Sequence, residues 1–179
     1  MSATAAATDP AEEVRTFKNA MRHLAAAVSV VTTGRGESRT GFTASSVTSL
    51  SMDPPTLLVC LNRQSSASPV LLAHGAFCIN VLASTQLHLA ERFTGRDGSH
   101  GAARYRDSTW QEMPSGALGN ADALALIDCE LEEAIDRHSH TILIGRPRHV
   151  VTNSRAEPLL YWHGAYRLLS SLDRVLTEA

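Results

Sequence analysis

The sequence predicts a mainly β fold, with flanking α-helices, in which antiparallel strands form a barrel. Two observations carry this prediction. Short β-branched or apolar runs recur along the chain between turn signals, and they do not alternate regularly with crossover helices, so a doubly wound parallel sheet is disfavoured. The length of 179 residues suits one domain. We place this domain at residues 11–179, after a flexible tail at 1–10 that is rich in Ala and Thr.

The first expected elements are a helix and a hairpin. Glu12 and Glu13 stand where negative charge suits a helix start, and the helix is predicted over 11–26. A β-branched strand at 28–33 then runs into a glycine-containing turn at 34–37, which predicts a hairpin. The helix prediction rests on four apolar residues at helical spacing: Val14, Phe17, Met21 and Leu24.

The second strand of that hairpin begins the most unusual stretch of the chain, residues 41–51. Six of these eleven residues are Ser or Thr. From Phe42 through Ser46 successive side chains alternate faces with period two, so one face of a strand can pack on a core while the other lies along a ligand. Hydroxyls and open backbone amides form an uncharged cradle for phosphate. The alternative is an ordinary Ser/Thr-rich edge strand or turn.

Two apolar strands and two short helices are expected next. The run at 57–61 is apolar at consecutive positions, which is typical of a strand buried on both faces. A helix at 69–74 takes Ser68 as N-cap and ends at Gly75, and a strand follows at 77–82. Ser84 caps a second helix at 85–92, with Leu87 and Ala90 facing inward, and Gly95 ends it.

The C-terminal half begins with a long glycine-containing stretch. Residues 95–119 contain five glycines and scattered charges, and we interpret them as a flexible lid or edge. Periodicity leaves 124–135 open between helix and strand. Strands are predicted at 141–151, 158–162 and 165–168.

Bulk composition narrows the function classes. With a formal charge of −2, the chain shows no electrostatic attraction to nucleic acid or to a bilayer, and no apolar run is long enough to span a membrane. Cys60, Cys78 and Cys129 are odd in number and lie in apolar runs, so we expect reduced, buried thiols. Reduced thiols and the lack of a leader-like start favour the cytoplasm.

Five motifs in order give the chain a resemblance to a known family. They are Gly41-Phe42-Thr43-Ala44-Ser45-Ser46, Pro54-Pro55, Cys60-Leu61-Asn62 with Ser65, Phe77-Cys78-Ile79-Asn80-Val81-Leu82 and Phe93-Thr94-Gly95. From about Phe17 to about Arg167 the chain resembles the short-chain flavin reductases, FMN-binding split barrels that include the reductase components of two-component flavin monooxygenases such as 4-hydroxyphenylacetate 3-monooxygenase. The resemblance implies a Greek-key antiparallel split β-barrel, a homodimer, and a strand at 124–135 with Cys129 buried.

The same resemblance implies a set of flavin contacts. The first contacting segment would be Thr43, Ala44, Ser45 and Ser46. Cys60, Leu61 and Asn62 would pass along the isoalloxazine or ribityl chain, and Ser65 would hold the phosphate with nearby amides. Arg92 and Phe93 match the family less closely as further contacts.

His140 is the candidate catalytic residue, because the family's Gly-Asp-His-Thr motif aligns with His138-Ser139-His140-Thr141. Its imidazole could orient the nicotinamide or supply a proton to the reduced flavin. Replacement of the family's Gly-Asp by His138-Ser139 leaves the role of the missing carboxylate open. Two alternatives remain, namely a histidine that is merely hydrogen-bonded and a metal site in which His138 and His140 join His149 or His163.

These observations predict an NAD(P)H-dependent flavin reductase. Hydride would pass from NADH or NADPH to FMN or FAD, and the reduced flavin would serve a separate monooxygenase component. Two other classes stay open: a flavin-binding split barrel that retains its flavin without reductase turnover, and a degenerate member that acts only as a structural partner. The sequence does not distinguish FMN from FAD or NADH from NADPH.

Overall fold

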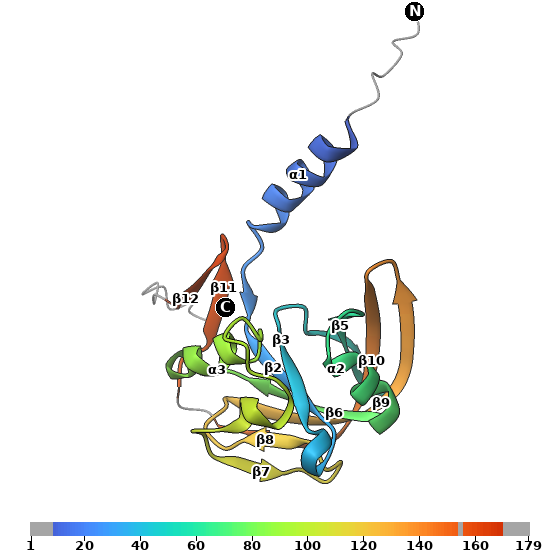
Figure 1. Cartoon of the computed structure of the whole chain (residues 1–179), viewed down its shortest axis with the longest axis vertical. Coiled ribbons are helices and arrows are strands. Elements are labelled where there is room, and N and C mark those ends of the chain that lie inside the picture. The colour runs from blue at the N-terminus through green and yellow to red at the C-terminus, as the bar shows by residue number, and fades with distance from the viewer. Residues whose placement is uncertain (1–8, 154–155, 170–179) are drawn as a thin grey trace, which may run out of the picture.

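Seven antiparallel strands form the main sheet of the computed structural model, which describes residues 9–153 and 156–169 (Figure 1). Their order is β3-β2-β6-β9-β10-β5-β4, so the predicted antiparallel, mainly β architecture is confirmed. The neighbours β2–β6 and β5–β10 are far apart in sequence. The seven strands are β2 (Ser29–Thr33), β3 (Thr40–Ala44), β4 (Thr48–Met52), β5 (Pro55–Asn62), β6 (Ala76–Val81), β9 (Ala125–Arg137) and β10 (His140–Thr152).

The hydroxyl-rich stretch at 41–51 connects the two edges of this sheet. It is not one strand, because the alternation predicted from Phe42 through Ser46 stops after Ala44, and 45–47 crosses from β3 to β4 at the opposite edge. The Ser46 hydroxyl accepts a hydrogen bond from Cys60 N at 3.1 Å and donates to Cys60 O at 3.4 Å. Ser46 therefore ties the end of β3 to β5 and helps the sheet to curl on itself.

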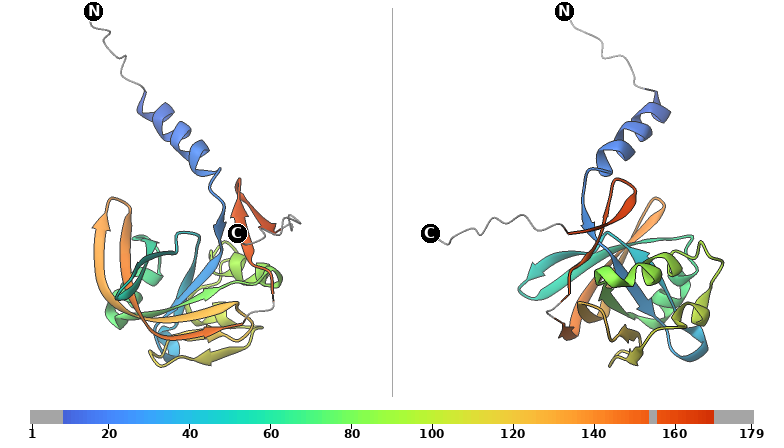
Figure 2. Two further views of the ribbon diagram at one scale, coloured as in Figure 1. Left: turned by 180° about the vertical axis from the view of Figure 1, so that it is seen from behind. Right: turned by 90° about the vertical axis from the view of Figure 1, so that its left-hand side faces the viewer.

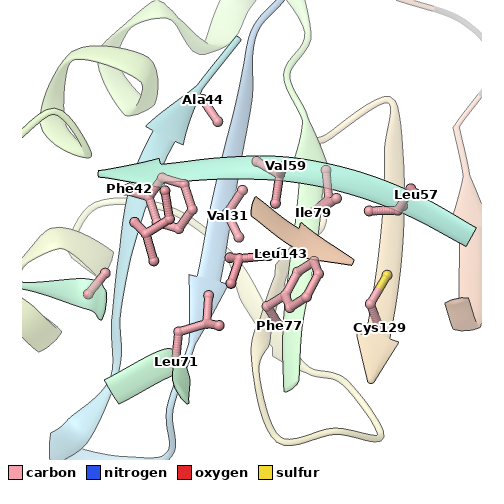
Figure 3. Close-up of a cluster of buried hydrophobic side chains, with 12 residues drawn as sticks. Val31, Phe42, Ala44, Leu57, Val59, Leu71, Phe77, Ile79, Cys129 and Leu143 are labelled. Carbon is pink, nitrogen blue, oxygen red and sulfur yellow. The ribbon is translucent and has the colours of Figure 1, made fainter. Parts of the chain in front are cut away.

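The barrel interior is filled by side chains from strands across the sheet (Figure 3). Phe42 on β3 and Val59 on β5 belong to one buried cluster, although these strands are not neighbours in the sheet. Leu71 from α2 (Ala67–His74) closes the cluster from outside the sheet. β5 alternates between buried and part-exposed residues, so the prediction that it is buried on both faces was wrong.

Two smaller layers cover the outside of the barrel. A three-stranded sheet is formed by β1 (Ala26–Ala27), β11 (Leu159–Trp162) and β12 (Ala165–Leu168), in the order β1-β11-β12. Its residue Leu159 packs with Phe93 and with Leu89 of α3 (Leu87–Arg92) in a second buried cluster. β7 (Trp110–Glu112) and β8 (Leu118–Asn120) form a separate hairpin.

Helix α1 (Pro10–Met21) projects away from the barrel in every view (Figures 1 and 2). It begins one residue after its N-cap Asp9 and ends at Met21 rather than Ala26, because Ala26 and Ala27 pair with β11. Pro10, predicted to close the tail, is therefore helical; residues 1–8 lie outside the described residues. No residue of α1 is buried. The predicted apolar stripe is exposed instead: Val14 52%, Phe17 64%, Met21 46% and Leu24 62%.

The stretch at 95–119, which we expected to be a flexible lid or edge, is folded onto the barrel. It contains the 3-10 turn η3 (Gly101–Tyr105) and the β7–β8 hairpin. Arg104 is buried and donates to the carbonyl oxygens of Gly41 and Ser99. Burial lowers the pKa of the Arg104 guanidinium and raises the pKa of the neighbouring Tyr105 hydroxyl, which donates to Thr40 O. The segment is thus anchored on β3.

The two short helices differ from prediction at their starts. α2 begins at Ala67 with Ser66, not Ser68, in the N-cap position; its predicted end at Gly75, with φ 69°, is confirmed. Ser84 begins the 3-10 turn η2 (Ser84–Gln86) that precedes α3. Leu87 is 39% exposed, so the inward-facing residues of α3 are Leu89 and Ala90.

The remaining strand predictions stand. The strand implied at 124–135 is β9, which begins one residue later at Ala125 and buries Cys129 as expected. All three cysteines are free; Cys78 and Cys129 are buried, whereas Cys60 is part-exposed, which corrects the expectation that all three are buried. None of the helices among the described residues has the length and apolar character needed to cross a membrane.

Candidate functional site

The candidate site is built on the β5–β10 strand pair. Cys60 pairs with Ile142, and Asn62 pairs with His140. Residues directly opposite each other in a strand pair share a face. Here that face is the one turned away from the core, because the intervening residues Leu61 and Thr141 are buried. The sheet therefore places Cys60, Asn62 and His140 in one row on an accessible surface.

The β9–β10 turn holds His140 in place. His138 lies in this turn with a left-handed φ of 51°, and His140 is the first residue of β10. The Ser139 hydroxyl lies 2.9 Å from His140 Nδ1. Ser139 therefore occupies the hydrogen-bonding position beside the imidazole, with a neutral hydroxyl in place of the carboxylate that the resemblance implies.

The loop after β5 braces the same turn. Arg63 N donates to Ser139 O at 3.0 Å, and the Arg63 guanidinium lies 3.3 Å from the Asp136 carboxylate. Asp136 Oδ1 also accepts from the Thr141 hydroxyl at 2.6 Å. The turn, the end of β5 and the start of β10 are thus bonded into one unit, so the orientation of His140 depends on backbone contacts as well as on its own side chain.

The positions of His138 and His163 do not fit the alternative of a histidine metal site. It required His138 and His140 to share a strand face, but His138 is in the turn. His163 lies in the β11–β12 turn instead, where its Nε2 is 3.1 Å from His23 Nδ1. Among the described residues, no three His, Cys, Asp or Glu side chains are grouped so that they could hold a metal ion.

Two of the three hydroxyls in the predicted flavin-contacting segment 43–46 form hydrogen bonds within the protein. The Thr43 hydroxyl donates to Ala90 O at 2.6 Å, and the Ser46 hydroxyl bonds to Cys60 as described. Ser45 is exposed, and no hydrogen bond joins its hydroxyl to the described residues. Ala44 is 6% exposed and belongs to the core, so its backbone is the part available to a ligand. Among these hydroxyls, that of Ser45 is therefore the one most available to donate a hydrogen bond to a ligand.

The loop around Ser65 is also internally bonded. Asn62 Oδ1 accepts from Gln64 N at 2.9 Å, and Asn62 O accepts from Ser65 N at 2.9 Å. Ser65 Oγ in turn accepts from Ala67 N at 3.3 Å. These bonds use amides that we expected to hold a phosphate. The Ser65 hydroxyl proton stays available to a ligand, and the assignment of Ser65 to the phosphate stays a prediction.

Arg92 and Phe93 occupy a different environment. Phe93 is 1% exposed and packs edge-on to Tyr105 with ring centroids 5.2 Å apart, so its ring is core. The Arg92 guanidinium donates to Arg106 O and lies 3.4 Å from the Asp107 carboxylate. Neither side chain is brought to the row on β5–β10. Leu61 likewise is buried, at 1% exposed, and offers only its backbone.

The structure also contains a groove that the sequence analysis did not predict, and Ser45 and Ser46 of the predicted flavin-contacting segment 43–46 border it. It has a volume of about 1110 Å³ and lies between α1, the β11–β12 turn and the 45–46 connection. Ser45 and Ser46 line it together with Trp162. Its charged lining residues are Arg15, Lys18, Arg22 and Arg96, with no Asp or Glu. The signal was present in part, because Arg15, Lys18 and Arg22 recur at helical spacing beside the apolar stripe of α1.

This arrangement fits a planar ring with an anionic tail. The row of Cys60, Asn62 and His140 gives a surface with one hydrogen-bonding amide and one imidazole, and the adjoining groove is positive. A surface of this kind binds and orients a cofactor while the cofactor supplies the reactive electronics. A strong acid–base pair is not required.

Comparison with known proteins confirms the family resemblance. Residues 21–170 match the family described as "Flavin reductase like domain". The chain is 42% identical over 170 residues to FMN reductase (NADH) RutF 2 of Methylorubrum extorquens, covering 93% of this chain and 96% of the relative. Two solved structures are similar. BorF, the flavin reductase component of a bacterial two-component tryptophan halogenase, has a TM-score of 0.81 and 32% identity, covering 89% of this chain and 99% of BorF. The NADH:FAD oxidoreductase SgcE6 of Streptomyces globisporus has a TM-score of 0.83 and 28% identity, covering 94% and 99%.

Proposed function

This chain belongs to the flavin reductase-like family, and from that premise we propose that it is an NADH-dependent flavin reductase that delivers reduced flavin to a separate oxygenase. The relative described above is named an FMN reductase that uses NADH, and SgcE6 is named an NADH:FAD oxidoreductase. We therefore propose NADH as the donor. FMN and FAD are both retained as acceptors.

The observation that carries the proposal is the row on β5–β10 beside the positive groove. Asn62 and His140 are direct partners in the strand pair, and both are exposed. Ser46 joins this row to the groove through its two hydrogen bonds with Cys60. We propose that this row holds the flavin ring.

The reacting molecules bring their own chemistry: reduced nicotinamide donates a hydride, and the flavin accepts it. What the protein must do is hold two rings face to face and keep them oriented, since positioning alone lowers the barrier of a two-reactant step. In our proposal Asn62 and the backbone of 60–62 hold one ring. His140, oriented by Ser139, holds the carboxamide of the other or moves a proton at Nε2.

We also propose that the protein works as a homodimer. The apolar stripe of α1 is exposed on a helix that touches little else, and Leu50 and Met52 on the edge strand β4 are 51% and 79% exposed. Exposed apolar surface of this kind is characteristic of protein interfaces. A second copy covering the outer turns of α1 would bury it. The free cysteines agree with the expected cytoplasmic location, which stays a prediction.

The proposal is tested by steady-state turnover. Purified protein is mixed with NADH in air, with FMN, with FAD or without flavin, and NADH absorbance is followed. We expect NADH loss that requires both protein and flavin. The rival function, a barrel that retains its flavin without turnover, predicts instead a protein that stays yellow through gel filtration and shows no flavin-dependent NADH loss.

A further inference from the structure

We propose that Arg63 and Asp136 are a positioning pair for His140: together they hold the β9–β10 turn in the conformation that orients the imidazole on the β5–β10 row. The inference rests on the proposed function, because it gives the two residues a role in the reductase reaction. It adds two residues that the family resemblance did not assign. Both act through His140, and neither has to contact a reacting ring.

The first argument is that packing does not hold this turn. The residues from Asp136 to His140 are all exposed. His138 has a φ of 51°, a left-handed conformation that glycine adopts freely and that a residue with a Cβ disfavours. The Gly of the family's motif aligns with His138. A backbone conformation of this kind persists only where surrounding contacts enforce it, so hydrogen bonds must fix the turn.

The second argument is that Arg63 supplies those bonds. Its backbone N donates to Ser139 O at 3.0 Å, and its Nη1 donates to His138 O at 3.4 Å. These are the carbonyl groups of the two residues that connect β9 to β10. Arg63 also follows Asn62 directly, and Asn62 is the strand partner of His140. One residue therefore fixes the turn relative to both polar members of the row.

The third argument is that Asp136 holds the guanidinium in place. Arg63 Nη2 lies 3.3 Å from Asp136 Oδ2, and Asp136 Oδ1 accepts from the Thr141 hydroxyl at 2.6 Å. Asp136 and Thr141 are partners across β9 and β10, and Thr141 is 2% exposed. A buried donor thus fixes the carboxylate, and the carboxylate orients the guanidinium.

A second ion pair on the same two strands shows what the first one adds. The side chains of Arg63 and Asp136 are 52% and 57% exposed, and those of Arg148 and Glu130 are 51% and 55% exposed. Ion pairs between exposed side chains contribute little to folding stability. Only the first pair is bonded to the turn, because Arg148 and Glu130 lie farther along the strand pair. We therefore expect loss of the first pair to lower activity, and loss of the second to change nothing.

The link to catalysis runs through Ser139. The Ser139 hydroxyl lies 2.9 Å from His140 Nδ1, and the Ser139 carbonyl oxygen accepts from Arg63 N. If the guanidinium no longer grips the turn, Ser139 and the imidazole beside it are free to shift. A displacement of about 1 Å in a positioned group costs up to about 100-fold in rate, so partial loosening should cost about tenfold.

The test compares Arg63→Gln and Asp136→Asn with the matched control Arg148→Gln. Asp136→Asn keeps an oxygen for the Thr141 hydroxyl and removes the charge that faces Arg63. With NADH and FMN, we expect kcat to fall by about tenfold in both variants and to stay unchanged in the control. Thermal unfolding followed by circular dichroism checks that all three proteins are folded.

A double-mutant cycle separates positioning of His140 from general loosening of the structure. Arg63→Gln is added to His140→Gln, and kcat is compared with that of His140→Gln alone. If Arg63 acts through the imidazole, it has nothing left to position, and the added change causes no further loss. If the two losses multiply, Arg63 acts independently of His140 and the inference is overturned.

NMR relaxation measures the turn without any turnover. Backbone amide order parameters of residues 138–140 should be about 0.85 in the wild-type protein and in Arg148→Gln, and should fall toward about 0.6 in Arg63→Gln. The inference is overturned if these values do not change, or if kcat of Arg63→Gln stays within about twofold of the control. Either result leaves the proposed function intact. If the wild-type protein itself shows no flavin-dependent NADH loss, the proposed function fails, and the order parameters alone decide whether the pair holds His140.

Discussion

Residues 95–120 and the surface around Ser45, Asn62 and His140 are both polar and irregular in sequence, yet the first is packed and the second is exposed. In the first region Arg104 and Tyr105 bond to carbonyl oxygens of β3, and Tyr105 and Trp110 pack together and against Phe93, which precedes the region. In the second, Ser45, Asn62 and His140 face solvent. Polar side chains in the first region therefore form hydrogen bonds that hold the fold together, whereas those in the second region remain available to bind a ligand.

The contrast extends to the cations. Arg104 is enclosed and bonded to carbonyl oxygens, whereas Arg22 and Arg96 line an open groove without a carboxylate partner among the described residues. Removing Arg104 should therefore lower stability. The predictions below test this division, beginning with the largest effect.

Gly41→Ala should be the most destabilising of these changes. An added Cβ would lie 2.4 Å from Val31 O and 2.8 Å from Phe93 Cε1, and neither the barrel backbone nor the buried ring can move freely. We expect a loss of about 3 kcal/mol in the free energy of unfolding, in the range of severe overpacking. Urea denaturation measures it. Ser45→Ala, only a few residues away but exposed, should change stability by less than about 0.5 kcal/mol.

His140→Gln should leave stability unchanged and reduce turnover. If the imidazole orients nicotinamide or moves a proton, kcat/KM for NADH should fall by about 100-fold. The matched control is His138→Gln in the same turn, which should lose little activity. If both variants lost kcat/KM equally, the activity would depend on the conformation of the turn and not on the His140 imidazole.

Arg104→Gln should loosen the packed region. The Gly41 and Ser99 carbonyl oxygens would lose their buried donor, at a cost of about 2 kcal/mol. Limited proteolysis should then cut within 95–101 faster than in the wild-type protein. Arg106→Gln, which removes an exposed guanidinium, is the control and should cut at the wild-type rate.

Ser139→Ala should have a modest effect confined to activity. It removes the hydroxyl 2.9 Å from His140 Nδ1, so the imidazole orientation is less restricted. We expect a decrease of about fivefold in kcat, about the value of one neutral hydrogen bond. Rescue by Ser139→Thr, which retains a hydroxyl, would assign the effect to the hydrogen bond and not to side-chain volume.

The three cysteines allow buried and accessible positions to be compared in the wild-type protein. Burial raises the pKa of the Cys129 thiol to about 12 and also raises the pKa of Cys78. Both thiols stay protonated near pH 8, so a thiolate-specific reagent should label part-exposed Cys60 first and the other two only after unfolding. Because an unfolded thiol ionises near pH 8.5, folding stability should decline as pH rises from there toward 12. Flavin should slow the labelling of Cys60.

Much of the fold could be predicted from local pattern, because β-branched runs and turn residues report strand and hairpin positions directly. The β2–β3 hairpin is an example. Periodicity left β9 open between helix and strand, and only the family resemblance implied the strand that pairs with β10. The helical pattern of α1 was also correct, but its end was not, because Ala26 pairs with β11, which is remote in sequence. The 95–119 segment was misjudged for the same reason: its order depends on Arg104 reaching Gly41.

The candidate site shows a similar limit. The positions of Asn62 and His140 in one strand pair follow from motifs that sequence analysis had singled out. The hydroxyl cradle was expected to be free, yet Thr43 and Ser46 bond to backbone atoms of α3 and β5. The groove escaped notice because Arg22, Arg96 and Trp162 come from three distant segments that only the folded chain brings together.

The most direct test of the central claim is a single-turnover experiment without oxygen. Protein, NADH and FMN are rapidly mixed, and the visible absorbance of oxidised flavin is followed. The account predicts that flavin bleaches at a rate proportional to protein concentration, that His140→Gln slows bleaching, and that Arg106→Gln, which removes an exposed guanidinium away from the β5–β10 row, does not. Flavin that stays oxidised at every protein concentration, with FMN and with FAD, would contradict it.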